Sequence, residues 1–126
     1  MGPERKLYAK VKKIIPKISW IRLENQGLHG TPDLLGYNDF GTFFTVELKV
    51  TKGNKVRFSP HQISFHVKHP HNTFIMVQAL GSGDVKLFRG SRIMELVACG
   101  LTLDACASTL DACRLLLEDL GGKGRP

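Results

Sequence analysis

The stretch from Thr42 to Val50 constrains the fold most, because it is a β-favouring apolar run that carries two charges. Side chains of a strand alternate between the two faces of a sheet, so Glu47 and Lys49 share one face and Leu48 lies on the other. Charges on a buried face are costly unless they are paired or bind an ion. The fold must therefore bury this strand and still provide partners for both charges.

Hydrophobic periodicity and breaker residues predict further elements on both sides of this strand. Apolar residues recur at helical spacing over residues 4–15, and Pro16 should end that helix. Residues 19–24 and 33–37 are predicted strands, and the turn residues 38–41 make the second of these a hairpin partner of 42–50. Ser59 and Pro60 predict the start of a helix over 60–68, before a second hairpin of 73–80 and 85–89. The order is that of an α/β domain with a helical tail.

The tail after residue 90 predicts two more helices. We expect Ser91 to cap a short helix that reaches Cys99, Gly100 to break it, and Thr102 to cap a last helix that ends near Asp119. Leucines and cysteines follow a heptad pattern along the last helix, at Leu103, Cys106, Leu110, Cys113, Leu117 and Leu120. Such a stripe packs a helix either on its own sheet or against a second copy of the chain. Residues 121–126 are expected to be flexible.

Composition and charge restrict the classes of function. The chain has 126 residues, enough for one domain, and lacks a run of about 20 apolar residues that would span a membrane. Its basic start is not followed by the apolar stretch of a signal peptide, so we expect neither a membrane protein nor a secreted one. Three cysteines without a CxxC pair favour a reducing cytoplasm. Residues 1–90 carry 14 Lys and Arg against 6 Asp and Glu, a net +8, whereas residues 91–126 carry a net −1. A basic first part is typical of a nucleic-acid-binding protein.

Asp33 follows Gly30-Thr31-Pro32 and brings a second carboxylate to the predicted hairpin. In an antiparallel pairing, Asp33 at the start of one strand lies near Glu47 toward the end of the other. Two carboxylates and the backbone carbonyl of Leu48 suit Mg²⁺ or Mn²⁺, with positions left for water and a phosphate oxygen. Lys49 would orient the attacking water or stabilise charge on the phosphate. The alternative is a salt bridge of Lys49 with Glu47 or Asp33.

Three short motifs in this order resemble the PD-(D/E)XK nuclease superfamily, and most closely its virus-type replication-repair (VRR-NUC) branch, which is similar to archaeal Holliday junction resolvases. The motifs are Gly30-Thr31-Pro32-Asp33, Glu47-Leu48-Lys49 and Ser59-Pro60-His61-Gln62. The resemblance covers residues 4–80 and implies a restriction-endonuclease-like core, αβββαβ, with a mixed sheet flanked by helices. The core would span residues 1–90, and residues 91–120 would pack on it or at a dimer interface.

The resemblance also implies roles for individual residues. Asp33, Glu47 and the Leu48 carbonyl would hold Mg²⁺ or Mn²⁺, Lys49 would be the catalytic lysine, and Gln62 would support the site from the next helix. Glu4 matches the glutamate on the first helix of the family pattern. Its alternative role is a first-turn carboxylate that complements the helix dipole.

Basic residues near these motifs are candidates for DNA contacts. Lys52, Lys55 and Arg57 follow the strand and could track a DNA backbone beside the metal, or form a solvated loop. Lys10 and Lys13 belong to a basic helix face that could form a second contact surface or be solvated. A histidine cluster lacks the spacing of a helical zinc pair and is expected to be solvated or to contact phosphate: His61, His66, His69 and His71.

The expected function is a metal-dependent endonuclease that hydrolyses DNA phosphodiesters. A chain of this length has little room for a base-reading module, so backbone contacts and DNA shape should dominate, which favours structure-selective over sequence-specific cutting. The resemblance to resolvases implies branched DNA such as a Holliday junction as the substrate, and because a four-way junction needs two symmetric incisions it also favours a homodimer. The alternatives are nicking, flap, homing-type or restriction-type cutting at the same site, or a non-catalytic nucleic-acid-binding module in which the charges form only an ion pair.

Overall fold

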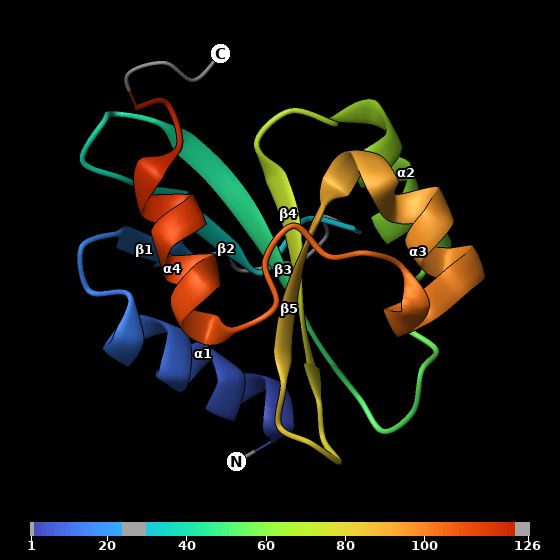
Figure 1. Cartoon of the computed structure of the whole chain (residues 1–126). Coiled ribbons are helices and arrows are strands. Elements are labelled where there is room, and N and C mark those ends of the chain that lie inside the picture. The colour runs from blue at the N-terminus through green and yellow to red at the C-terminus, as the bar shows by residue number, and fades with distance from the viewer. Residues whose placement is uncertain (1, 24–29, 123–126) are drawn as a thin grey trace.

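The computed structural model describes residues 2–23 and 30–122. These residues form an α/β fold in which a five-stranded mixed sheet is flanked by four α-helices (Figure 1). The helices are α1 (Pro3–Ile14), α2 (Pro60–Lys68), α3 (Ile93–Cys99) and α4 (Leu110–Asp119). The strands are β1 (Ser19–Arg22), β2 (Leu34–Tyr37), β3 (Phe43–Thr51), β4 (Thr73–Ala79) and β5 (Val85–Arg89). Within the described ranges, no helix has the length and apolar character needed to cross a membrane.

The strands lie in the sheet in the same order as in the chain. Both predicted hairpins are confirmed, because β2 pairs with β3 and β4 with β5 in antiparallel fashion. β3 and β4 are parallel, and α2 is the crossover between them. β2 begins at Leu34, opposite Val46 of β3. The second half of β3 therefore continues past the end of β2, which opens a place for a site.

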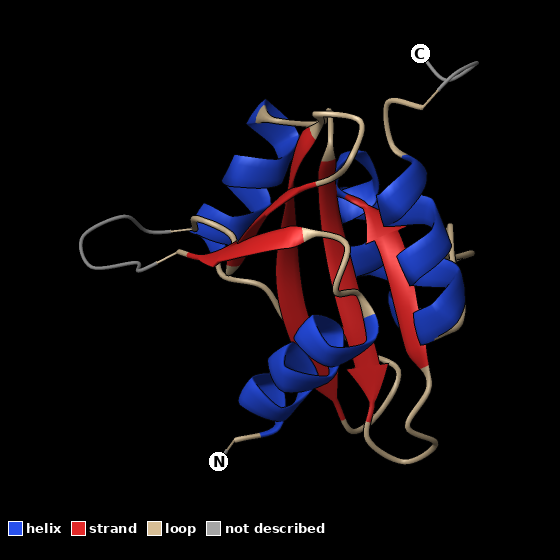
Figure 2. Ribbon diagram, turned by 90° about the vertical axis from the view of Figure 1, so that its left-hand side faces the viewer, coloured by secondary structure: helices blue, strands red, loops and turns tan. Residues whose placement is uncertain are grey.

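Helices cover both faces of the sheet. α1 and α4 lie on the face seen in Figure 2, where Leu7 and Val11 of α1 and Leu117 of α4 share a core cluster with Leu48. α2 and α3 lie on the opposite face, over a second cluster that includes Ile75 and Val77. Glu47 pairs with Ile75 and Lys49 with Val77, so alternation places both charges on this second face. The two charges consequently face α2.

Local signals account for the start of α2. Ser59 is the N-cap, with Pro60 in the first turn. The Ser59 hydroxyl accepts a hydrogen bond from the Gln62 backbone N–H at 3.1 Å, and Gln62 Oε1 accepts one from the Ser59 backbone N–H at 2.9 Å. This capping box fixes the Gln62 side chain as well as the helix.

The structure corrects the prediction for the tail. Ser91 lies inside a short 3₁₀ helix, η1 (Gly90–Arg92), and makes no cap, whereas Gly100 ends α3 with φ of +61° as expected. Thr102 begins no α-helix, because it belongs to a second 3₁₀ helix, η2 (Gly100–Thr102). The residues after η2 are extended, and α4 begins only at Leu110, where the Thr109 hydroxyl accepts a hydrogen bond from Ala112 N–H at 3.0 Å.

The heptad stripe is broken for a physical reason. The free side of β5 offers backbone hydrogen-bonding groups, and residues 106–107 take them: Cys106 N–H donates to Leu87 O and Leu87 N–H to Ala107 O, each at 2.8 Å. Leu103 and Cys106 are therefore not on the helix, and the prediction of one continuous helix is wrong. Cys113 and Leu117 of α4 are buried in the core cluster, so α4 packs on the sheet. Glu24 and residues 123–126 lie outside the described residues.

Candidate active site

The β2–β3 hairpin brings Asp33 to β3, as the sequence predicted. Asp33 Oδ2 accepts a hydrogen bond from the Leu48 backbone N–H at 2.8 Å, and the Asp33 carbonyl accepts one from Leu23 N–H at 2.8 Å. Asp33 therefore replaces the strand partner that β3 lacks beyond Val46. Its carboxyl group also contacts that of Glu47.

Position 30, in the loop before Asp33, requires glycine. Its φ is +83°, and a Cβ atom there would lie 2.3 Å from the carbonyl oxygen of His61 in the first turn of α2. A side chain would push the loop away from α2. The close approach joins the segment that carries Asp33 to the helix that carries Gln62.

Glu47 is a buried carboxyl group, with 3% of its surface exposed. Its Oε2 accepts a hydrogen bond from Gln62 Nε2 at 3.2 Å. Burial, the charge of Asp33 and a carboxyl–carboxyl hydrogen bond with Asp33 raise the pKa of Glu47 to about 9, against the opposing effect of Lys49. At neutral pH without metal, Glu47 thus keeps its proton. In the ionised form, Oε1 has no hydrogen-bond donor among the described residues.

Lys49 and Glu47 are joined through Gln62. Lys49 Nζ donates a hydrogen bond to Gln62 Oε1 at 3.0 Å, while it lies 4.0 Å from Glu47 Oε2. Nζ also lies 4.9 Å from the centre of the Phe58 ring. The salt bridge considered as an alternative is present only as a long contact. Gln62, held by its capping box, sets the distance between the ammonium and the buried acid.

Glu4 lies at the rim of the site. It lines a cavity of about 130 Å³ together with Asp33 and Leu48, and a second groove together with Lys49. Partial burial, and then the charge of Asp33, raise the pKa of Glu4, while Lys49 lowers it. In the part of the chain that the structure describes, no three His, Cys, Asp or Glu side chains are arranged to hold a metal ion. A hard cation at this site would therefore rely on Asp33, Glu47, the Leu48 carbonyl and water.

Sequence reasoning missed four residues that line the 130 Å³ cavity, namely Arg5, Tyr8, Arg22 and Leu34. Arg22 lies over the Tyr8 ring, with Cζ 5.7 Å from the ring centre. Tyr8 follows Glu4 by four residues, and this helical spacing could have placed it beside the site. Arg22 carries no comparable signal, because only the pairing of β1 with β2 brings it next to Leu34.

The basic candidates fall into two groups. Lys52, Lys55 and Arg57 are exposed and line the groove of about 550 Å³ that also contains Glu4 and Lys49, so the structure brings them to the site. Lys10 and Lys13 are exposed on α1 and line neither cavity.

One histidine departs from the prediction of solvated side chains. His66 is fully buried, Nδ1 lies 2.9 Å from the Gln62 carbonyl oxygen, and burial lowers the pKa of its imidazole. It lies on the buried side of α2. The other three histidines of the cluster are exposed.

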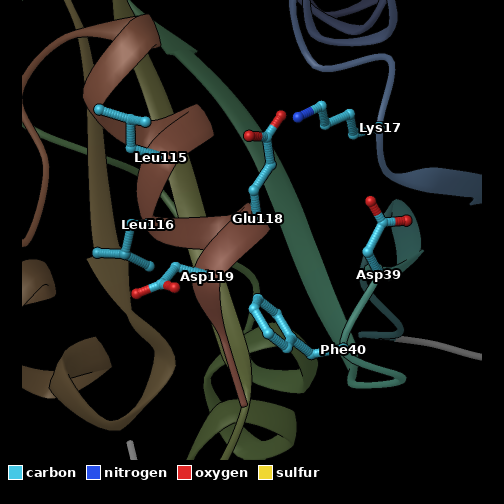
Figure 3. Close-up of a pocket in the computed structure, with 7 residues that line it drawn as sticks. All are labelled: Lys17, Asp39, Phe40, Leu115, Leu116, Glu118 and Asp119. Atoms are coloured by element: carbon cyan, nitrogen blue, oxygen red, sulfur yellow. The ribbon is translucent and has the colours of Figure 1, made fainter. Parts of the chain in front are cut away.

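A larger pocket of about 590 Å³ lies between α4 and the turn that joins β2 to β3 (Figure 3). In Figure 3, Lys17 points toward Glu118, and Phe40 lies below them. None of its lining residues belongs to the three motifs. No protein-family model matches the chain, and comparison with curated proteins finds no match either.

Proposed function

We propose that the protein is a metal-dependent DNA endonuclease with a restriction-endonuclease-like core of the PD-(D/E)XK superfamily, VRR-NUC branch. The observation that carries this proposal is the carboxyl pair formed by the buried Glu47 and the half-buried Asp33. Two acids in contact share a proton when no cation is present, and a divalent cation satisfies both once that proton leaves. The ionised Glu47 Oε1 without a donor fits such an ion.

The residues present fit Mg²⁺ or Mn²⁺, because both ions prefer oxygen ligands and keep several waters. Asp33, Glu47 and the Leu48 carbonyl would hold the ion. When bound, it would polarise the phosphate and lower the pKa of an attacking water.

Lys49 supplies a positive charge beside the two acids. Gln62 fixes its ammonium group at 3.0 Å, so the charge is placed before substrate arrives. Such a preorganised charge stabilises negative charge that develops on a phosphate oxygen. Gln62 also donates to Glu47 and so holds the acid and the ammonium in one arrangement.

The substrate we favour is branched DNA, including the Holliday junction, cut by a homodimer in the cytoplasm. The cations around the site are side chains suited to phosphate contacts, which read backbone and shape rather than bases. The heptad stripe does not lie on one continuous helix and so does not support dimerisation through the tail. The argument for a dimer is therefore the need for two symmetric incisions. The mass of the protein in solution, measured by light scattering, tests whether it is a dimer.

The decisive experiment incubates the chain with labelled junction, flap, splayed and duplex DNA, with Mg²⁺, with Mn²⁺ and with EDTA. Wild type should cut only with metal, and Lys49→Ala should abolish cutting while most binding persists. Lys68→Ala, an exposed lysine of α2, is the matched control and should cut normally. Binding without incision in either metal would favour the non-catalytic module, and normal cutting by Lys49→Ala would reject the role of Lys49.

A further inference from the structure

The basic loop 52–57 is held in place from outside the predicted nuclease core. The carbonyl of Asn54 accepts a hydrogen bond from Leu101 N–H at 2.9 Å, and Asn54 Nδ2 donates one to Cys99 O at 3.0 Å. Both partners lie at the junction of α3 and η2. The glycine and the two lysines of this loop suggest flexibility, but Asn54 at its centre makes two hydrogen bonds to the tail.

Gly100 makes this contact possible. Its φ is +61°, and a Cβ atom built there would lie 2.2 Å from the Asn54 carbonyl oxygen. A backbone atom cannot move aside as a flexible side chain can, so any larger residue at this position must displace the loop. The junction thus requires glycine both for its conformation and for the approach of Asn54.

The loop is anchored a second time by an apolar side chain. Val56 is buried in the same cluster as Ile93 and Leu96 of α3. Within the loop, the Thr51 hydroxyl donates to the Lys55 carbonyl at 2.8 Å. Lys52, Lys55 and Arg57 are exposed next to these anchored residues, and they line the groove that also contains Glu4 and Lys49. The groove therefore has four cationic side chains and one carboxyl group, that of Glu4, and the loop that forms one side of it is held in place. The cations are Lys49, Lys52, Lys55 and Arg57.

We propose that the α3–η2 junction, Cys99 to Leu101, is a positioning element for substrate binding. It holds the basic loop in the conformation that binds a nucleic-acid phosphate backbone beside the candidate site. This inference rests on the proposed function, and it gives the tail a role in that function. Cationic side chains on a loop whose backbone is already held in place bind phosphates with less loss of conformational entropy than the same side chains on a mobile loop would. The junction acts through Lys52, Lys55 and Arg57, and it touches no substrate itself.

The test compares Gly100→Ala with Gly83→Ala. Gly83 has φ of +79° but open space around its Cβ position, so it reproduces the backbone strain without the collision. DNA binding is measured in EDTA over a range of salt concentrations. Gly100→Ala should weaken binding at least tenfold and lower the salt slope by up to about 3, the value for three lost phosphate contacts. Gly83→Ala should bind as wild type does.

A double-mutant cycle shows whether the effect passes through the loop. In a chain that already carries Lys52→Gln, Lys55→Gln and Arg57→Gln, Gly100→Ala should weaken binding no further. An unchanged tenfold effect in that background would overturn the proposal, because the junction would then act elsewhere. In cleavage assays, Gly100→Ala should raise KM and leave kcat close to wild type. A loss of kcat with unchanged KM would also overturn it.

Asn54→Ala is the second variant, for use if Gly100→Ala does not fold. It removes the bond to Cys99 O and adds no bulk, and the same cycle applies to it. The clamp, meaning the two hydrogen bonds between Asn54 and the α3–η2 junction, can be tested without DNA. Hydrogen exchange at the Leu101 amide, which donates to Asn54 O, measures how often it opens. Slow exchange is expected in wild type, fast exchange in Gly100→Ala, and a smaller acceleration in Asn54→Ala, which keeps the Asn54 carbonyl. Fast exchange in wild type would show that the loop is not held by these bonds and would refute the proposal. If the clamp is intact but wild type binds no DNA at low salt, the proposed function has failed instead.

Discussion

Replacing Glu47 by glutamine should make the metal-free protein more stable, and increasingly so as the pH rises. In the folded state the pKa of Glu47 is raised from its ordinary value of 4.5 to about 9, first by burial and then by Asp33. Below pH 4.5 the carboxyl group is protonated in both the folded and the unfolded chain. As the pH rises toward 9, only the unfolded chain ionises freely, so the free energy of unfolding falls.

The size of the effect follows from the pKa difference. Each pH unit inside this window changes the free energy of unfolding by about 1.4 kcal/mol. Between pH 5 and pH 8, wild type should lose roughly 4 kcal/mol because of Glu47. Glutamine imitates the protonated acid, since its oxygen can accept from Gln62 Nε2 and its amide group can donate to Asp33. Glu47→Gln should therefore lack this loss.

The assay is urea unfolding in EDTA at several pH values between 5 and 8. Glu95→Gln is the control, because Glu95 is exposed and paired with Arg92, which lowers the pKa of its carboxyl group. Glu95 is thus ionised in both states over this range, and its variant should run parallel to wild type. Saturating Mg²⁺ should flatten the wild-type pH dependence alone, since an ion at this site binds the ionised acid. A constant difference between Glu47→Gln and wild type across the pH range would refute the reasoning.

Three further predictions concern other contacts. Ser59→Ala removes one half of the capping box and should lower the free energy of unfolding, measured in urea, by about 1 kcal/mol. It should also reduce kcat, because Gln62 is then no longer held in place. Unchanged kcat would show that Gln62 is held without the cap. Asn38→Ala removes four hydrogen bonds: Nδ2 donates to Leu117 O at 3.0 Å and to Leu120 O at 2.8 Å, and Oδ1 accepts from Phe40 N–H at 3.0 Å and from Thr42 N–H at 3.1 Å. It should destabilise the chain by about 1–3 kcal/mol, with Asp39→Ala expected to change little. Arg22→Gln should weaken DNA binding and lower the salt slope by about 1; an unchanged slope would place Arg22 away from the backbone.

Much of the first two thirds could be predicted because its signals are local. Ser59 and Pro60 start a helix wherever they precede a suitable sequence, and α2 has the predicted bounds. Alternation along β3 and the hairpin before it are enough to bring Asp33 to Glu47. The motifs coincide with these elements, so the candidate site residues were predicted together with the fold.

The remainder depended on contacts between distant segments. The stripe from Leu103 to Leu120 fits a helix as well as it fits an extended segment followed by a helix. Hydrogen bonding of Cys106 and Ala107 to Leu87 decides between these two, and no local pattern encodes it. Arg22 reaches the cavity only through strand pairing. The raised pKa of Glu47 likewise depends on α2 covering that face of the sheet.

The parallel pairing of β3 and β4 has a consequence for folding. The other neighbouring strands of the described part are antiparallel, whereas α2 must pass over a face before β4 can align with β3. The same helix delivers Gln62 to Glu47 and Lys49. Pairing of β4 with β3 and docking of Gln62 onto Glu47 and Lys49 are hence a single step. A partly folded chain with only the first three strands in place contains Asp33 and Glu47 but lacks the contacts of Gln62 that hold the acid and the ammonium together.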